Sequence, residues 1–194
     1  MDPNPFELFV HVSGVIGLFV GYATLLLGTT ALRRTNRVED ARVIARIITA
    51  GRQIGFEYIS VIDVIVVASV LVLAASGLDM ARYTGDWRSG WAQVSIATLV
   101  LLAPVGPFVI NPRLHAIARA TEQAEAGTIP PSLRAQLTHP VLAVTLRASF
   151  MTLIALVFLM IVKPPFWWAV IAVLSALVVG LEWAAAEAIR RRVG

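Results

Sequence analysis

Four ionisable side chains lie inside long apolar stretches of the chain, and they are the first candidates for chemistry. They are His11, Asp63, Arg147 and Glu182. An ionisable group in hydrocarbon costs at least about 2.5 kcal/mol, so such residues usually pair with one another or serve a function. We therefore expect these side chains to face the interior of a helical bundle.

Asp63, Arg147 and Glu182 fall at similar depths in their stretches, which predicts a buried polar set. An ion pair of Arg147 with Asp63 or Glu182 is the simplest arrangement, because an unpaired ion in this medium would lose its charge. Two roles stay open for these residues. The ion pair fixes the register of the helices, or the set relays a proton or a substrate whose anionic group binds Arg147. Glu57 and Glu187 lie near the ends of their stretches and are expected to be solvated.

His11 is followed by Gly14, Gly17 and Gly21 at helical spacings, so it shares a helix face with small residues. Such a face packs closely in membranes, against another helix or a second copy of the chain. There His11 is a candidate cofactor ligand for haem iron or copper, a proton carrier, or a donor of one structural hydrogen bond. No second histidine lies at this depth, so haem iron would be five-coordinate or would use another ligand such as Met160.

The elements that must position these residues are membrane helices. The 194-residue chain is 58% hydrophobic and 14% charged, which is outside the range of water-soluble domains. Five stretches are long enough to cross a hydrocarbon core about 30 Å thick. They are residues 8–32, 55–78, 91–110, 141–162 and 166–188. The predicted fold class is all-α, a polytopic membrane helical bundle with five transmembrane helices in one integral membrane domain, 1–194.

Lysine and arginine are distributed unequally between the two ends of this bundle. Thirteen of the sixteen fall at one end, in or beside the first and third connections and at the C-terminus. Because cytoplasmic loops retain these residues, the N-terminus is predicted outside and the C-terminus inside. Trp87, Trp91, Trp167 and Trp168 gather at the opposite end, as an aromatic belt would. We expect a multi-pass membrane protein.

The longer connections carry amphipathic patterns. Residues 33–54 alternate apolar and charged positions with helical period, which predicts a cytoplasmic helix that runs unbroken into the second span. Residues 111–140 form a second cytoplasmic amphipathic segment. Pro104, Gly106 and Pro107 interrupt the third span, since each proline removes a backbone hydrogen bond. Such a break provides a kink, a hinge or exposed carbonyls for cations.

No sequence pattern assigns a reaction. The chain has no cysteine, which excludes disulfides, thiolate metal sites and a cysteine nucleophile. It also has no nucleotide-binding glycine loop, hydrolase or EF-hand motif, and no basic run interleaved with aromatics for nucleic acid. The chain is therefore more consistent with a non-enzyme. Three function classes stay open: a cofactor-binding membrane protein, a small ion-coupled transporter, and a structural partner, any of them as a homo-oligomer.

Two stretches carry a family resemblance. They are FVHVSGVIGLFVGYATLLL in the first span and HPVLAVTLRASFMTLIALVFLMIVKPPFWW around Arg147. With the order and lengths of the other spans, they resemble a bacterial membrane family known as domain of unknown function 2269. The His11 and Gly21 pair is also similar to one in membrane protoporphyrinogen oxidases and copper-resistance D proteins, which implies haem, porphyrin or copper handling through His11. Leu18 stands where the oxidase pattern has tryptophan, and no Pro-Arg follows Gly21.

Overall fold

The computed structural model describes residues 4–54 and 57–193, and within them five helices are long and apolar enough to cross a membrane. Their principal segments are α1 (Pro5–Arg34), α3 (Val61–Thr84), α4 (Gly90–Leu102), α7 (Pro140–Val162) and α8 (Phe166–Val193). The shorter elements are α2 (Val38–Ile48), β1 (Gly51–Ile54), β2 (Glu57–Ser60), η1 (Asp86–Arg88), η2 (Gly106–Ile110), α5 (Asn111–Gln123) and α6 (Pro131–Thr138). This arrangement confirms an integral membrane helical bundle.

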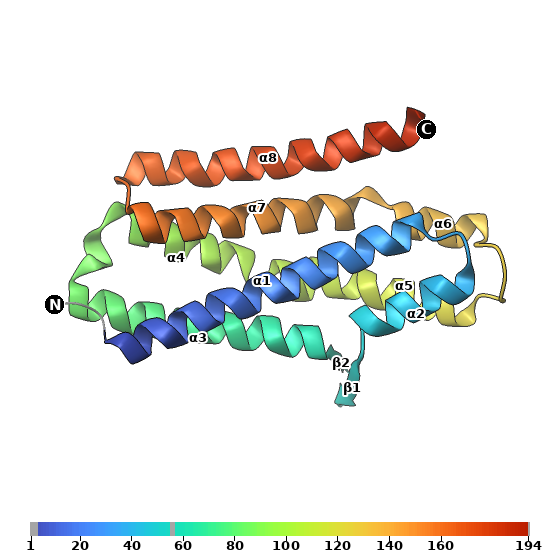
Figure 1. The fold of residues 1–194 in the computed structure, drawn as a ribbon, viewed down its shortest axis with the longest axis horizontal. Helices are drawn as coiled ribbons and strands as arrows, with labels where there is room; N and C mark the ends of the chain where they lie inside the picture. The colour runs from blue at the N-terminus through green and yellow to red at the C-terminus, as the bar shows by residue number, and fades with distance from the viewer. Residues whose placement is uncertain (1–3, 55–56, 194) are drawn as a thin grey trace.

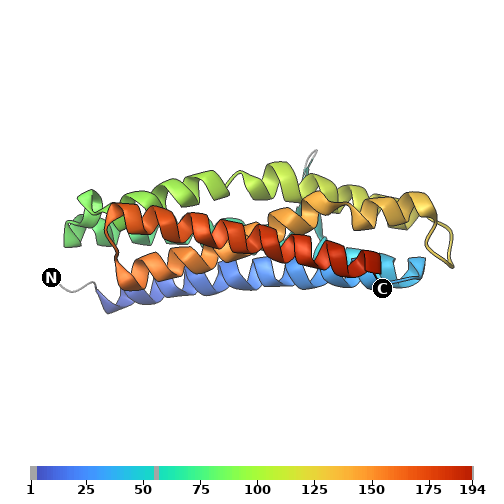
Figure 2. The same cartoon turned by 90° about the horizontal axis from the view of Figure 1, so that it is seen from above.

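The long helices pack side by side with α7 at the centre. Helix α7 lies between α8 and α1, and α3 lies on the other side of α1 (Figure 1). Helix α4 packs on both α7 and α8. The two ends of the chain lie at opposite ends of the bundle, as an odd number of spans requires (Figures 1 and 2).

The glycine face of α1 packs against α3 within the same chain. A Cβ atom added at Gly14 would lie 3.0 Å from Leu73, and those added at Gly17 and Gly21 would collide with Ser69 and Val66. The absence of side chains therefore permits the close approach of the two helices. Since α3 covers this face, a homo-oligomer would have to use a different surface.

The second span begins later than the sequence predicts. The amphipathic helix expected over residues 33–54 ends at Ile48, and an antiparallel β1–β2 hairpin separates it from α3. The predicted start at Gly55 lies outside the described residues. A capping box starts α3 instead: the Ser60 hydroxyl accepts from Asp63 N, and the Asp63 carboxylate accepts from Ser60 N, both at 3.0 Å. The prediction was wrong because this box ends the hairpin and fixes the first turn of the helix.

The proline break in the third span is confirmed. Helix α4 ends at Leu102, and a turn at Ala103 and Pro104 leads into the π-helical segment η2, which continues directly into α5. Figure 2 shows the interruption in this path. Beyond the break, α5 packs against α2 and α6.

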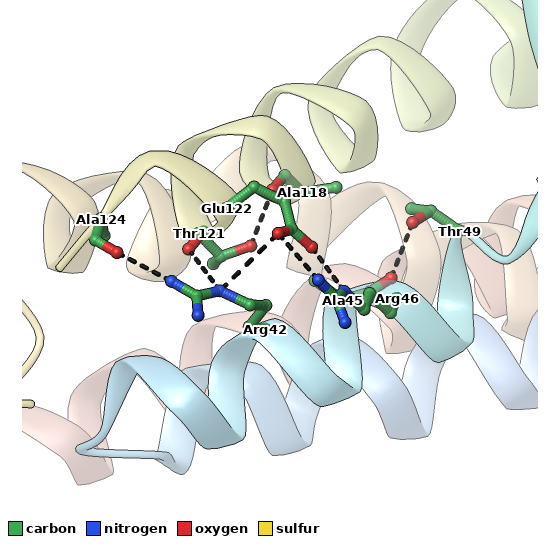
Figure 3. A network of polar contacts seen from close by, with 8 residues as sticks. All are labelled: Arg42, Ala45, Arg46, Thr49, Ala118, Thr121, Glu122 and Ala124. Carbon is green, nitrogen blue, oxygen red and sulfur yellow. Dashed lines mark hydrogen bonds and ion pairs between the residues drawn. The ribbon is translucent and has the colours of Figure 1, made fainter. Parts of the chain in front are cut away.

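Helices α2, α5 and α6 pack with the end of α1 into an arginine-rich cap at one end of the bundle (Figure 1). Arg42 donates to the carbonyls of Thr121 and Ala124 at 3.1 and 2.8 Å, and Arg46 forms a two-point ion pair with Glu122 at 2.6 and 3.0 Å (Figure 3). The hydrogen bond to Glu122 raises the pKa of Arg46. Two of the arginines that set the charge bias, Arg42 and Arg46, therefore also hold α2 and α5 together.

Candidate functional site

The most buried charge of the described residues is Arg147 of α7, which contacts α8. Its side chain is 3% exposed, and its Nη2 donates to Glu187 Oε2 on α8, whose side chain is 21% exposed. Its Nη1 donates to the carbonyl of Ala143 at 3.1 Å. The guanidinium also lies 5.3 Å from the centre of the Trp183 ring, a cation–π distance. An ion pair, a carbonyl and an aromatic face thus stabilise one cation.

The predicted partners of Arg147 were wrong. Glu182 is exposed on α8, and Asp63 is half-buried in the capping box that starts α3. Glu187, which we expected to be an ordinary interface residue, takes their place. A helix turns about 100° per residue, so the five positions that separate Glu182 from Glu187 place them on different sides of α8. The sequence does contain a signal for Glu187. It follows Gly180 by seven residues and Trp183 by four, spacings that place all three on one face of a helix.

Gly180 determines which face of α8 meets α7. A Cβ added there would lie 2.7 Å from Ala148 Cα and 2.9 Å from the carbonyl oxygen of Arg147, both backbone atoms that cannot rotate away. The two helices therefore approach closely one residue from the buried arginine. Trp183 and Glu187 follow on the same face, so this close contact directs both side chains at Arg147.

An open pocket adjoins the ion pair at the end of the bundle that carries the cap. It has a volume of about 530 Å³ and lies between the ends of α1 and α8. Its lining residues are Arg33, Arg34, Trp183, Ala186, Glu187 and Arg190. Three of the six are arginines, and the one carboxylate already binds Arg147. The pocket is therefore suited to hold a negatively charged group.

His11 lies in a separate polar contact between α1 and α3. The residue is 8% exposed, and its Nδ1 lies 3.0 Å from Ser76 Oγ, while Ser76 Oγ donates to the carbonyl of Val72 at 2.6 Å. Because the hydroxyl has one proton, Nδ1 of His11 must be the donor to Ser76, which leaves Nε2 as the acceptor nitrogen. A Cβ added at Gly77 would lie 3.3 Å from His11 Cε1. The imidazole is thus packed tightly against α3.

Comparison with known proteins gives a family but no reaction. A family model described as predicted integral membrane protein (DUF2269) matches residues 8–164. The chain belongs to this family. Neither the curated proteins nor the solved structures contain a match. The DUF2269 match includes Arg147 and the spans from α1 to α7, whereas Glu187, Trp183 and Arg190 follow the matched residues.

The chemistry available to this DUF2269 protein differs between the two polar contacts. Within residues 4–54 and 57–193, no three metal-binding side chains of the histidine, cysteine and carboxylate types are gathered at one point. His11 does not line the pocket between α1 and α8. A metal at Nε2 would therefore need ligands of another type, such as the Met160 thioether. The Arg147 region, in contrast, combines fixed positive charge with open space.

Proposed function

We propose that this DUF2269 protein is a membrane-embedded binding protein that holds an anionic ligand in the pocket between α1 and α8. The observation that carries the proposal is the concentration of three arginines around a space of about 530 Å³. Ligand pockets typically have volumes of about 300–1,000 Å³, so the space is adequate for a small phosphate- or carboxylate-bearing group. Binding in this pocket requires no reaction and no resident cofactor.

Two of the arginines are available to such a ligand. Arg34 and Arg190 are exposed, and neither makes a salt bridge among the described residues. Arg33 is held more firmly, since its Nη2 donates to the carbonyl of Thr138 at 2.9 Å. Glu187 does not neutralise the pocket, because Arg147 binds its carboxylate. The pocket therefore keeps a positive potential that favours an anion.

The test is thermal unfolding of the purified protein in an uncharged detergent, after removal of bound lipid, with added glycerol phosphate at constant ionic strength. A ligand that binds the folded state raises Tm with concentration. We expect the rise in the wild type and its loss in the double variant Arg34→Gln/Arg190→Gln. Arg119→Gln is the matched control, because Arg119 is an exposed arginine of the same cap outside the pocket. An equal rise in all three proteins would contradict the proposal.

The proposal places this pocket at the cytoplasmic face of the bacterial inner membrane, with the N-terminus outside and the C-terminus inside. Support comes from the thirteen arginines at the end of the bundle that carries the cap. Because the chain has no cysteine, single cysteines report orientation without background. In intact cells, a membrane-impermeant thiol reagent should label Arg88→Cys and leave Ala126→Cys unlabelled. The reverse pattern would invert the topology.

Metal or haem ligation by His11 is a second candidate, carried by the acceptor nitrogen Nε2 that the Ser76 hydrogen bond leaves available. The test is the absorbance spectrum of the purified protein, oxidised and dithionite-reduced, after expression with added haem. A Soret band that disappears in His11→Ala would support ligation. A colourless wild-type protein would exclude haem, and copper content by mass spectrometry would test the metal separately.

Ion-coupled transport through Asp63, Arg147 and Glu182 stays a weaker alternative. Of the three side chains, Arg147 alone is fully buried. Flux into liposomes before and after Asp63→Asn tests this alternative. A relay residue would lose flux with little change in stability, whereas a capping residue would lose stability without a selective loss of flux.

A further inference from the structure

We infer that the anion is the phosphate of a bilayer phospholipid with a net negative headgroup, which enters the pocket sideways from the membrane. This inference rests on the proposed function, because it names the class of ligand for the same pocket.

Both helices continue the pocket as apolar surface toward the bilayer centre. On α1, Leu27 precedes Arg34 by seven residues and is 70% exposed. On α8, Trp183 and Val179 precede Arg190 by seven and eleven residues and are 39% and 50% exposed. Spacings of seven and eleven return to nearly the same helix face, about 10 and 16 Å deeper. Each helix therefore presents a basic residue at its end and large apolar side chains below it.

This order of groups matches an amphiphile better than a water-soluble anion. A phospholipid has its phosphate at the level of the interface and its chains directed to the bilayer centre. Arg34 is the last residue of α1, and Arg190 lies near the end of α8, so both lie at the interface end of their helices. Trp183 has the mixed character typical of interface residues, and the face of its ring lies against Arg147. A free anion would gain nothing from Leu27 or Val179.

The pocket is accessible because α1 and α8 do not pack tightly against each other. Helix α8 makes its main contacts with α7 and α4, whereas α1 makes its main contacts with α3, α7 and α2. The ends of α1 and α8 therefore face each other across the pocket instead of packing tightly. In Figure 1 the last turns of α8 stand away from α1 at the end that carries the C-terminus. Basic pockets between membrane helices on the cytoplasmic side are known sites for anionic headgroups.

The positive charge of the pocket favours a lipid with a negative headgroup. The available guanidinium groups of Arg34 and Arg190 come from different helices and face one space. They favour a lipid with net negative charge, such as phosphatidylglycerol, over a zwitterion, because the choline cation of phosphatidylcholine would meet the same arginines. The binding contribution of each basic residue near an anionic lipid surface corresponds to roughly fivefold in affinity.

The experiment is native mass spectrometry of the purified protein in neutral detergent with phosphatidylglycerol and phosphatidylcholine added in competition. The wild type should bind phosphatidylglycerol preferentially. Arg34→Gln/Arg190→Gln should lower the preference by roughly fivefold for each arginine, whereas Arg119→Gln should keep it. Leu27→Ala/Val179→Ala should weaken the binding of the lipid and leave the response to glycerol phosphate unchanged. The double variant Leu27→Ala/Val179→Ala therefore distinguishes a lipid ligand from a water-soluble anion.

The outcomes distinguish this inference from the proposed function. Equal binding of the two lipids by the wild type, or a preference that survives in Arg34→Gln/Arg190→Gln, overturns the lipid inference. If glycerol phosphate still raises Tm in a manner that depends on Arg34 and Arg190, the anion pocket stands and its ligand is water-soluble. If neither lipid selectivity nor the effect of glycerol phosphate depends on these arginines, both proposals fail.

Discussion

Among the described residues, two of the buried polar contacts that join neighbouring helices differ in what surrounds them. His11 and Ser76 join α1 to α3 through one hydrogen bond between groups that need no charge. Arg147 and Glu187 join α7 to α8 through an ion pair that adjoins a pocket of about 530 Å³. The first contact is packed closely against a glycine, whereas the second opens toward three further arginines. Burial alone therefore does not identify a site, and the space beside the buried group is the more informative property.

The largest expected effect comes from removing the carboxylate of the ion pair. Glu187→Ala removes the carboxylate that pairs with the buried guanidinium of Arg147, and the loss of one partner of a buried ion pair typically costs about 3–5 kcal/mol. We expect the free energy of unfolding in detergent to fall by about 3 kcal/mol, since Glu187 is partly exposed. Denaturant titration followed by tryptophan fluorescence measures the change.

Glu182→Ala is the matched control for that change. It removes the same side chain from the same helix, five residues away, at an exposed position. An exposed substitution of this kind is expected to change stability by less than about 0.5 kcal/mol. Equal losses for Glu182→Ala and Glu187→Ala would contradict the assignment of the partner of Arg147 and remove the distinction between the two polar contacts.

Hydropathy and proline positions were sufficient to predict the bundle but not the partner of Arg147. Each span is predicted from the mean hydropathy of about 20 consecutive residues. A single residue changes this mean only slightly, so the number of spans is predicted well. The choice between Glu182 and Glu187 depends instead on the angle around α8, which a single residue step changes by about 100°. That angle is set by the close approach at Gly180, which the pattern of hydrophobicity does not contain.

Asp63 was misplaced for a different physical reason. The helical period of the first connection continues as far as Ile48 in the structure, and the prediction extended it to residue 54. A hairpin then intervenes, so the carboxylate that seemed eight residues deep lies in the first turn of α3. The Ser60-x-x-Asp63 spacing is a capping pattern that the sequence already contained. The hydrogen bonds of this capping box start a new helix at Val61, so the helix of the first connection does not continue into the second span.

The close approach at Gly180 gives the second prediction, which tests how α7 and α8 hold the ion pair. Gly180→Ala forces a methyl group against the backbone at Ala148 and Arg147, and overpacking of this kind costs about 1–3 kcal/mol. We expect a loss of about 2 kcal/mol in the same titration. Gly106→Ala is the control, because a Cβ there meets no atom within 4 Å. Equal free energies of unfolding for Gly180→Ala and Gly106→Ala would mean that α7 and α8 do not need close contact at Gly180 to hold the ion pair.

The smallest effect is expected at the other contact. Ser76→Ala removes the acceptor of His11 Nδ1, and hydrogen bonds between membrane helices contribute about 0.6 kcal/mol on average. We expect a loss near that value in the same titration, with no change in the phosphatidylglycerol preference, because His11 and Ser76 lie outside the pocket. The glycines of α1 keep the helices together without this bond. A loss above about 2 kcal/mol, or a change in lipid preference, would mean that the two contacts are coupled through α1, since Arg33 and Arg34 lie at the other end of the same helix.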